Sequence, residues 1–192
     1  MPKAICGATA YDPEAQFCDS RNIQLYTPVT IGEQVWMKEN LNYNASGSKC
    51  YGNDPGNCAK YGRLYDWETA NDACPTGWHL PSDAEWTALE TAVGGNITAG
   101  KKLKATSGWD NNKEDLSGNG TDDYGFSAKP GGQGNSAGQF AYEGSDAFWW
   151  SASKSDSEDN TYKNYEVYSD SDAARWRNFT NLILISVRCL KD

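Results

Sequence analysis

CPTGWHLPSDAEWTAL, residues 74–89, is the stretch that decides the fold. Ser82 and Glu85 match a capping box, in which the hydroxyl and the carboxylate each accept a hydrogen bond from a backbone N–H at a helix start. Trp86 and Leu89 follow at helical spacing, which indicates one buried face. We therefore expect an amphipathic helix beginning at Ser82, with Cys74 shortly before it.

Working outward, apolar residues at helical spacing predict another helix over residues 61–73, ended by Pro75. Residues 25–37, LYTPVTIGEQVWM, predict a hairpin that bends over residues 31–34. Strands are expected at residues 148–151, 162–168, 174–179 and 183–189. This order predicts an α+β fold with two helices, short twisted strands and long irregular loops.

The six cysteines indicate disulfide bonds. Zinc would require Cys-x-x-Cys spacing or histidine partners, and the only histidine, His79, has no such neighbour. Many pairings are open for six cysteines; we favour Cys6–Cys18 and Cys50–Cys58 because they close short loops, which leaves Cys74–Cys189. Disulfides point to an oxidising compartment, so a secreted or cell-surface protein is expected.

The charge and the hydrophobic pattern restrict the classes of molecule that the protein could bind. A net charge of −9 argues against binding nucleic acid or an anionic membrane surface. The longest apolar run, residues 182–185, is far too short to cross a bilayer. No stretch resembles a signal peptide, and we expect Met1 to begin a trimmed form of the protein. We also expect a monomer.

Several motifs together resemble one protein family. They are VTIGEQVWMKENLNY (29–43), YGRLYDWETA (61–70), the stretch 74–89, KKLKATSGW (101–109), DDYGFSAKPGG (122–132), FWWSAS (148–153) and SVRCLKD (186–192). The chain is similar here to the Fibrobacter succinogenes major paralogous domain family. The resemblance implies a C-type-lectin-like fold, related to the formylglycine-generating enzyme branch, over residues 21–192. Residues 1–20 then look like a small accessory hairpin stapled by cysteines, with a turn at residues 11–13.

A ligand surface is predicted in the C-terminal strands. Residues 160–181 are rich in Asn, Tyr, Ser, Asp and Arg, a composition typical of adaptable recognition surfaces. The segment also resembles the diversified region of lectin-like receptors. Adjacent strand residues point to opposite faces, so we expect Trp149 in the core and Trp150 outside. The alternative is a strand pair whose aromatic side chains pack inward. The candidate ligand-binding residues are Trp150, Tyr162, Asn164, Tyr168, Trp176, Asn178 and Phe179.

A structural calcium ion is a further expectation. Residues 106–139 form a long, glycine-rich loop that supplies carboxylate oxygens, the ligands that Ca²⁺ prefers. The candidate ligands are Asp110, Asp115, Asp122 and Asp123. The Glu-Pro-Asn and Gln-Pro-Asp triplets of calcium-dependent lectins are absent, which argues against sugar chelation by calcium. The alternative is a solvated acidic loop.

These observations predict a recognition or adhesion module that binds an extracellular glycan or protein, and no enzyme. One alternative is a formylglycine-type oxidase, which would need a reactive cysteine pair. Another is a polysaccharide-active enzyme using carboxylates such as Glu68 and Asp72. A third is a structural protein of surface assembly.

Overall fold

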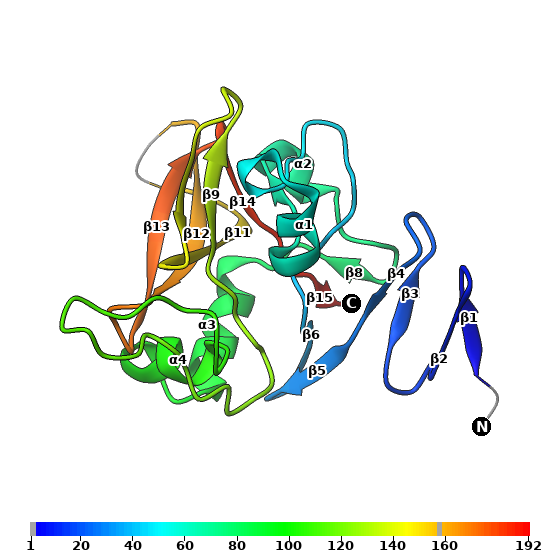
Figure 1. Ribbon diagram of the computed structural model, residues 1–192, viewed down its shortest axis with the longest axis horizontal. Helices are drawn as coiled ribbons and strands as arrows, with labels where there is room; N and C mark the ends of the chain where they lie inside the picture. The colour runs from blue at the N-terminus through cyan, green and yellow to red at the C-terminus, as the bar shows by residue number, and fades with distance from the viewer. Residues whose placement is uncertain (1–2, 157–158) are drawn as a thin grey trace.

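The computed structural model describes residues 3–156 and 159–192 of the 192-residue chain (Figure 1). It confirms an α+β class with three disulfides. Within the described residues no helix has both the length and the apolar character needed to cross a membrane. More helices are present than the two expected. They are a 3₁₀ turn at Tyr51–Asn53, α1 (Pro55–Tyr61), α2 (Trp67–Asn71), α3 (Asp83–Ala92) and α4 (Asn96–Leu103).

The larger sheet has the strand order β10-β9-β14-β11-β12-β13, and β7 pairs with β14 beside this path. One pairing, between β11 and β14, is parallel and the others are antiparallel. The strand expected over residues 148–151 lies within β11, and those expected over 162–168 and 174–179 correspond to β12 and β13. The strands are β7 (Leu64–Tyr65), β9 (Gly131–Asn135), β10 (Phe140–Glu143), β11 (Asp146–Lys154), β12 (Thr161–Tyr168), β13 (Ala174–Thr180) and β14 (Ile183–Ser186).

A second sheet has the order β5-β6-β15-β8. Its strands are β5 (Pro28–Ile31), β6 (Gln34–Met37), β8 (Trp78–His79) and β15 (Leu190–Lys191). The hairpin expected over residues 25–37 is confirmed, and Gly32 turns it at φ 61°, a left-handed conformation that favours glycine. The single strand expected over 183–189 is wrong, because the chain leaves β14 after Ser186 and reaches β15 in the other sheet.

The helix expected over residues 61–73 is also wrong. Gly62 ends α1 with φ 80°, and a Cβ there would lie 2.8 Å from the Leu41 carbonyl oxygen. The chain therefore turns at Gly62 and pairs as β7 before α2 begins. Asp66 caps α2 by accepting a hydrogen bond from the Thr69 backbone N–H at 2.7 Å. A close backbone approach thus divides an apparently continuous helical pattern.

Helix α3 agrees with the sequence prediction. The capping box between Ser82 and Glu85 is present, and Trp86 and Leu89 are buried. Helix α4 was not expected, because glycines flank and interrupt it. Gly100 lies inside α4, where a Cβ would come within 2.5 Å of the Ala173 carbonyl oxygen. That glycine is needed for close packing and does not mark a loop.

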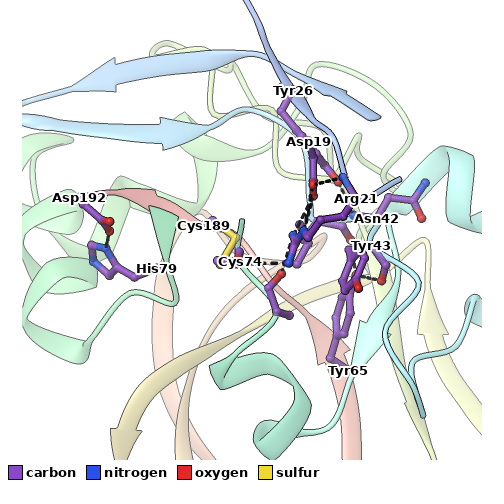
Figure 2. The surroundings of a disulfide bond; sticks show 12 residues. Asp19, Arg21, Tyr26, Asn42, Tyr43, Tyr65, Cys74, His79, Cys189 and Asp192 are labelled. Carbon is purple, nitrogen blue, oxygen red and sulfur yellow. Dashed lines mark hydrogen bonds and ion pairs between the residues drawn. A yellow bond between two sulfur atoms is a disulfide. The ribbon is translucent and has the colours of Figure 1, made fainter. Parts of the chain in front are cut away.

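The three disulfides pair as the sequence predicts: Cys6–Cys18, Cys50–Cys58 and Cys74–Cys189. Figure 2 shows the third, which joins the chain shortly before α3 to the chain just before β15. The sole histidine lies in β8, next to the end of the chain. His79 contacts Glu85 at 2.9 Å and Asp192 at 2.7 Å, so its ring links α3 to the chain end.

The N-terminal segment forms two small antiparallel pairs at one end of the molecule (Figure 1). They are β1 (Ala4–Cys6) with β2 (Thr9–Tyr11), and β3 (Phe17–Asp19) with β4 (Gln24–Tyr26). The first hairpin turns at residues 7–8 and not at 11–13, because Gly7 supplies the left-handed φ of 61°.

Arg21 fastens this segment to the rest of the chain (Figure 2). Its guanidinium donates to both carboxylate oxygens of Asp19 and to the Ala73 carbonyl at 2.9 Å. The same group lies 4.0 Å from the centre of the Tyr43 ring. Nearby, Phe17 stacks on Trp78 with ring centroids 4.5 Å apart. The segment is therefore held by ionic, hydrogen-bonding and aromatic contacts.

Two hydrophobic cores lie on opposite faces of the β11–β12 pair. Trp149 belongs to the first core, which includes Trp86 of α3 and Tyr165 of β12. Trp150 belongs to the second, which includes Tyr65 of β7. Covering both faces leaves little of this strand pair for solvent, and that decides where a ligand could bind.

Candidate functional site

Four predicted ligand-binding residues are buried. Trp150 and Asn164 have no exposed surface, and Tyr162 and Tyr168 are 8% and 7% exposed. The expectation that Trp150 faces outward is wrong. Its ring does point away from Trp149, as strand alternation requires, but that second face is also covered. Trp150 and Asn164 therefore cannot contact a ligand directly in this conformation, whereas the small exposed part of Tyr162 borders a separate pocket with Lys154 and Asn160.

Asn164 has an unusual environment for a buried amide. Neither its side-chain oxygen nor its nitrogen has a hydrogen-bond partner. It lies opposite Trp150 on β11 and Arg177 on β13. Burying an unpaired amide costs roughly 1–3 kcal/mol in proteins. Its neighbours on the sheet supply packing without satisfying it.

Glu166 lies on the same face and is buried. It accepts a hydrogen bond from Arg177 at 2.9 Å, and Arg175 lies 3.7 Å away. Tyr168 also donates to this carboxylate. Burial raises the pKa of Glu166, and the two arginines only partly offset it. The sequence reasoning missed this group, although antiparallel pairing of the two strands would place Glu166 opposite Arg175.

The other three predicted residues lie on β13, one of the two strands that end the larger sheet (Figure 1). Trp176 and Phe179 are half-buried, and Asn178 is exposed. Phe179 packs on Phe148, with ring centroids 5.6 Å apart. Strand alternation separates Trp176 and Asn178 from Phe179, so only the first two share a face.

Trp176 and Asn178 line a groove of about 300 Å³ between β13 and α3. We call this the α3–β13 groove. The Trp176 ring packs edge-on against Tyr165 at 5.3 Å, which fixes it against the first core. Asp83 and Thr87, which lie one helical turn apart on α3, form one wall of the groove. The lining residues are Asp83, Thr87, Lys163, Trp176, Arg177 and Asn178.

A charge pair crosses this groove. Lys163 of β12 donates to the Asp83 carboxylate at 2.7 Å, and Ser153 donates to it at 2.9 Å. The hydrogen bond from Lys163 lowers the pKa of Asp83, and the hydrogen bond from Ser153 adds to this. Asp83 also opens α3, where the helix dipole favours a negative charge. The groove therefore presents fixed charged groups beside an aromatic ring.

Sequence reasoning did not identify Asp83 and Lys163 as site residues. Asp83 reads as an ordinary first-turn residue of a capped helix. Lys163 could have been found from the strand pattern, because antiparallel pairing with β13 places it opposite Asn178. No local signal in the sequence indicates that α3 packs beside that edge.

The structure does not gather the predicted calcium ligands. Among the described residues no cluster of three or more His, Cys, Asp or Glu side chains could hold a metal. Asp122 instead accepts hydrogen bonds from the backbone and hydroxyl of Ser127, and Asp115 accepts one from Asn111. Asp110 and Asp123 are exposed. The loop is braced by Asx-type hydrogen bonds and not by a preformed ion cage.

All six cysteines are in disulfides, so no thiol remains for the cysteine chemistry of a formylglycine-type oxidase.

Comparison with known proteins gives one match. The model of the Fibrobacter succinogenes major domain matches residues 29–191. No curated protein matches the chain. No solved structure matches it either.

Proposed function

The chain belongs to the Fibrobacter succinogenes major domain family, and from that premise we propose that it is an extracellular recognition module that binds a glycan in the α3–β13 groove. The observation that carries this proposal is the placement of the Trp176 ring among hydrogen-bonding side chains in one concave site. Ligand sites combine an apolar wall with a few placed polar groups in this way.

A sugar fits the chemistry of the groove. One face of a pyranose ring carries C–H groups that pack on an aromatic ring, while its hydroxyls need donors and acceptors. Trp176 supplies the ring, and Asn178 supplies an amide that makes no hydrogen bond with another described residue. The Asp83–Lys163 pair adds an acceptor and a donor that are already held in place. Preorganised groups lower the entropy lost on binding.

The fold we propose is C-type-lectin-like and related to the formylglycine-generating enzyme branch. Two features support it: a long-range disulfide that ties the chain before α3 to the chain before β15, and a small sheet that contains both β8 and β15. We also propose a secreted or cell-surface location, because structural disulfides are characteristic of oxidising compartments. The module is proposed to act as a monomer and without catalysis.

A protein ligand is the second candidate. The residues at and just beyond the edge strand β13 favour it. Arg175, Arg177 and Phe179 lie together on one face of β13, and Leu182 just beyond is 63% exposed. Arginine and aromatic side chains are enriched in protein–protein contacts. Arg177 also lines the α3–β13 groove, but Arg175 and Phe179 do not, so substitution of Arg175 separates the two candidates.

A glycan array probed with the purified chain, with and without calcium, tests the proposal. We expect binding that does not depend on calcium. Trp176→Ala and Asn178→Ala should each weaken it by about tenfold, the loss of one good contact of roughly 1.4 kcal/mol. Asn44→Ala is the matched control, because Asn44 is an exposed asparagine between β6 and α1.

Melting temperatures of the variants report whether each still folds. Binding that survives both groove substitutions but is lost in Arg175→Ala would transfer the function to the opposite face of β13. No binding to any glycan, together with capture of a protein partner through Arg175, would replace the first candidate with the second.

A further inference from the structure

A larger cavity, of about 560 Å³, lies elsewhere on the molecule and shares no lining residue with the α3–β13 groove. The segment after β6, the end of α1 and the loop after α4 surround it. Arg188, which follows β14, also lines it. We call it the Arg188 cavity. None of the candidate ligand-binding residues predicted from the sequence borders it.

Arg188 is 1% exposed, yet no carboxylate of the described residues pairs with it. Its Nη1 donates to the carbonyls of Met37, Lys38 and Phe126, and its Nε and Nη2 both donate to Asn40 Oδ1. Nη2 carries two hydrogens, so one donor of this buried cation has no acceptor among the described residues. The positive charge is held by these oxygen acceptors, by the Phe126 ring, whose centre lies 4.2 Å from the guanidinium carbon, and by the attraction of Glu39 and Asp122.

The walls carry further positive charge. Lys38, Lys60 and Lys129 line the same cavity, against two carboxylates, Glu39 and Asp122. In a chain of net charge −9, this is a local excess of cations. The Lys38 ammonium makes no hydrogen bond or ion pair within the part of the chain that the structure describes.

Both carboxylates of the cavity are already engaged. Glu39 accepts a hydrogen bond from the Thr27 backbone at 2.8 Å. Asp122 accepts hydrogen bonds from the backbone and the hydroxyl of Ser127. Lys129 donates to the Lys60 carbonyl and the Lys60 ammonium lies 3.9 Å from Glu143, so the Lys38 ammonium and the spare Arg188 donor are the cationic groups with unused capacity for a ligand.

We propose that the Arg188 cavity binds a small polyhydroxylated carboxylate of the size and chemistry of a hexuronic acid. The carboxylate of the ligand would accept hydrogen bonds from the Lys38 ammonium and from the spare Arg188 donor, both of which lack partners among the described residues. Short polar side chains on the walls, including Gln24, Asn42 and Ser107, suit the hydroxyls. A cavity of this volume falls within the range of small-molecule sites. A charged hydrogen bond to a carboxylate is stronger than a neutral one, so the acid should be selected over the neutral sugar.

Isothermal titration with three probes tests this: glucuronate, its methyl ester and glucose. We expect glucuronate to bind at low salt and the two neutral probes to bind at least about tenfold more weakly, because charge-assisted hydrogen bonds would be lost. Affinity should fall as salt is added. Equal affinity for glucose and glucuronate, or no binding of glucuronate at millimolar concentration, would overturn the proposal.

Lys38→Met identifies the site without disturbing the buried Arg188. It should weaken glucuronate binding by about tenfold, whereas Lys191→Met, which removes an exposed lysine of β15, should leave it unchanged. Asn178→Ala should also leave it unchanged, because Asn178 does not border this cavity. Failure of Lys38→Met to weaken binding would place glucuronate elsewhere and overturn the assignment. Because the two sites share no residue, this outcome says nothing against the α3–β13 groove.

Discussion

Trp149 and Trp150 are consecutive residues of β11 whose indole N–H groups are satisfied in separate cores. Trp149 donates to Asn40 Oδ1 at 2.8 Å, and Trp150 donates to the Tyr65 carbonyl at 2.7 Å. The sheet is therefore fixed from both faces by aromatic side chains that each carry one polar contact. Buried tryptophans usually have such a partner for the indole N–H, although the buried Nε1 of Trp86 has none among the described residues.

Trp150→Phe should destabilise the fold by about 1–3 kcal/mol, because it leaves the buried Tyr65 carbonyl without its donor and also opens a small void. Urea unfolding followed by circular dichroism measures the change. An exposed Trp150 would tolerate the substitution, so an unchanged unfolding midpoint would contradict the burial described above.

Two asparagines of this region should respond oppositely to replacement by leucine. Asn164→Leu removes an amide with no partner, so the unfolding free energy should be unchanged or slightly higher. Asn40→Leu removes the acceptor of Arg188 and Trp149, so it should lose about 3–5 kcal/mol. Urea unfolding of the pair is the measurement. A large loss in Asn164→Leu would show that its amide is paired through ordered water.

Removing the Cys74–Cys189 disulfide with a double alanine substitution should cost about 4–5 kcal/mol, because it releases a loop closed across 115 residues. The Cys6–Cys18 disulfide spans only 12 residues, so its removal by the same double substitution should cost less unfolding free energy, about 3 kcal/mol. Thermal or urea unfolding of both variants gives the comparison. Equal losses would mean that chain entropy is not the main source of this stabilisation.

Lys104 should make stability depend on alkaline pH. It is 1% exposed and donates to the Tyr168 and Ser171 carbonyls, and burial lowers its pKa from 10.5 to about 8, against the attraction of Asp172. Between pH 8 and 10.5 the unfolded chain then binds more protons than the folded one. Stability contributed by this group therefore rises with pH across that window, by up to roughly 3 kcal/mol.

Comparison with Lys104→Met isolates this contribution from other groups that titrate at high pH. The difference in unfolding free energy between the two proteins should be flat below pH 8 and should change in favour of the wild type as pH rises to 10.5. A difference that stays constant from pH 7 to 10.5 would show that Lys104 keeps its ordinary pKa.

The elements specified by local chemistry were predictable from sequence. Helix α3 begins at a capping box, and the β5–β6 hairpin turns at Gly32; both signals lie within a few residues. The break at Gly62 and the helix around Gly100 were not predictable, because in each case the glycine is required by a distant backbone segment. Local propensity does not report such contacts.

The candidate site also has features that the sequence predicts and features that it does not. The alternation of side chains along a strand correctly predicts that Trp149 and Trp150 lie on opposite faces of the sheet. It does not predict that other residues cover the Trp150 face as well. The α3–β13 groove contains two predicted residues, Trp176 and Asn178, because they are on an edge strand. The Arg188 cavity was missed altogether, since its walls come from segments far apart in the chain and none carries a recognisable motif.

The position of β15 has a consequence for folding. Leu190 pairs with Trp36 of β6 on one side and with His79 of β8 on the other, so the second sheet has a gap in its middle until residue 190 is available. Until residue 190 is in place, β6 lacks one of its two neighbours in this sheet and β8 has none. The Cys74–Cys189 disulfide, whose formation from two thiols needs a separate two-electron oxidant, then locks β15 between its neighbours, because Cys189 directly precedes Leu190.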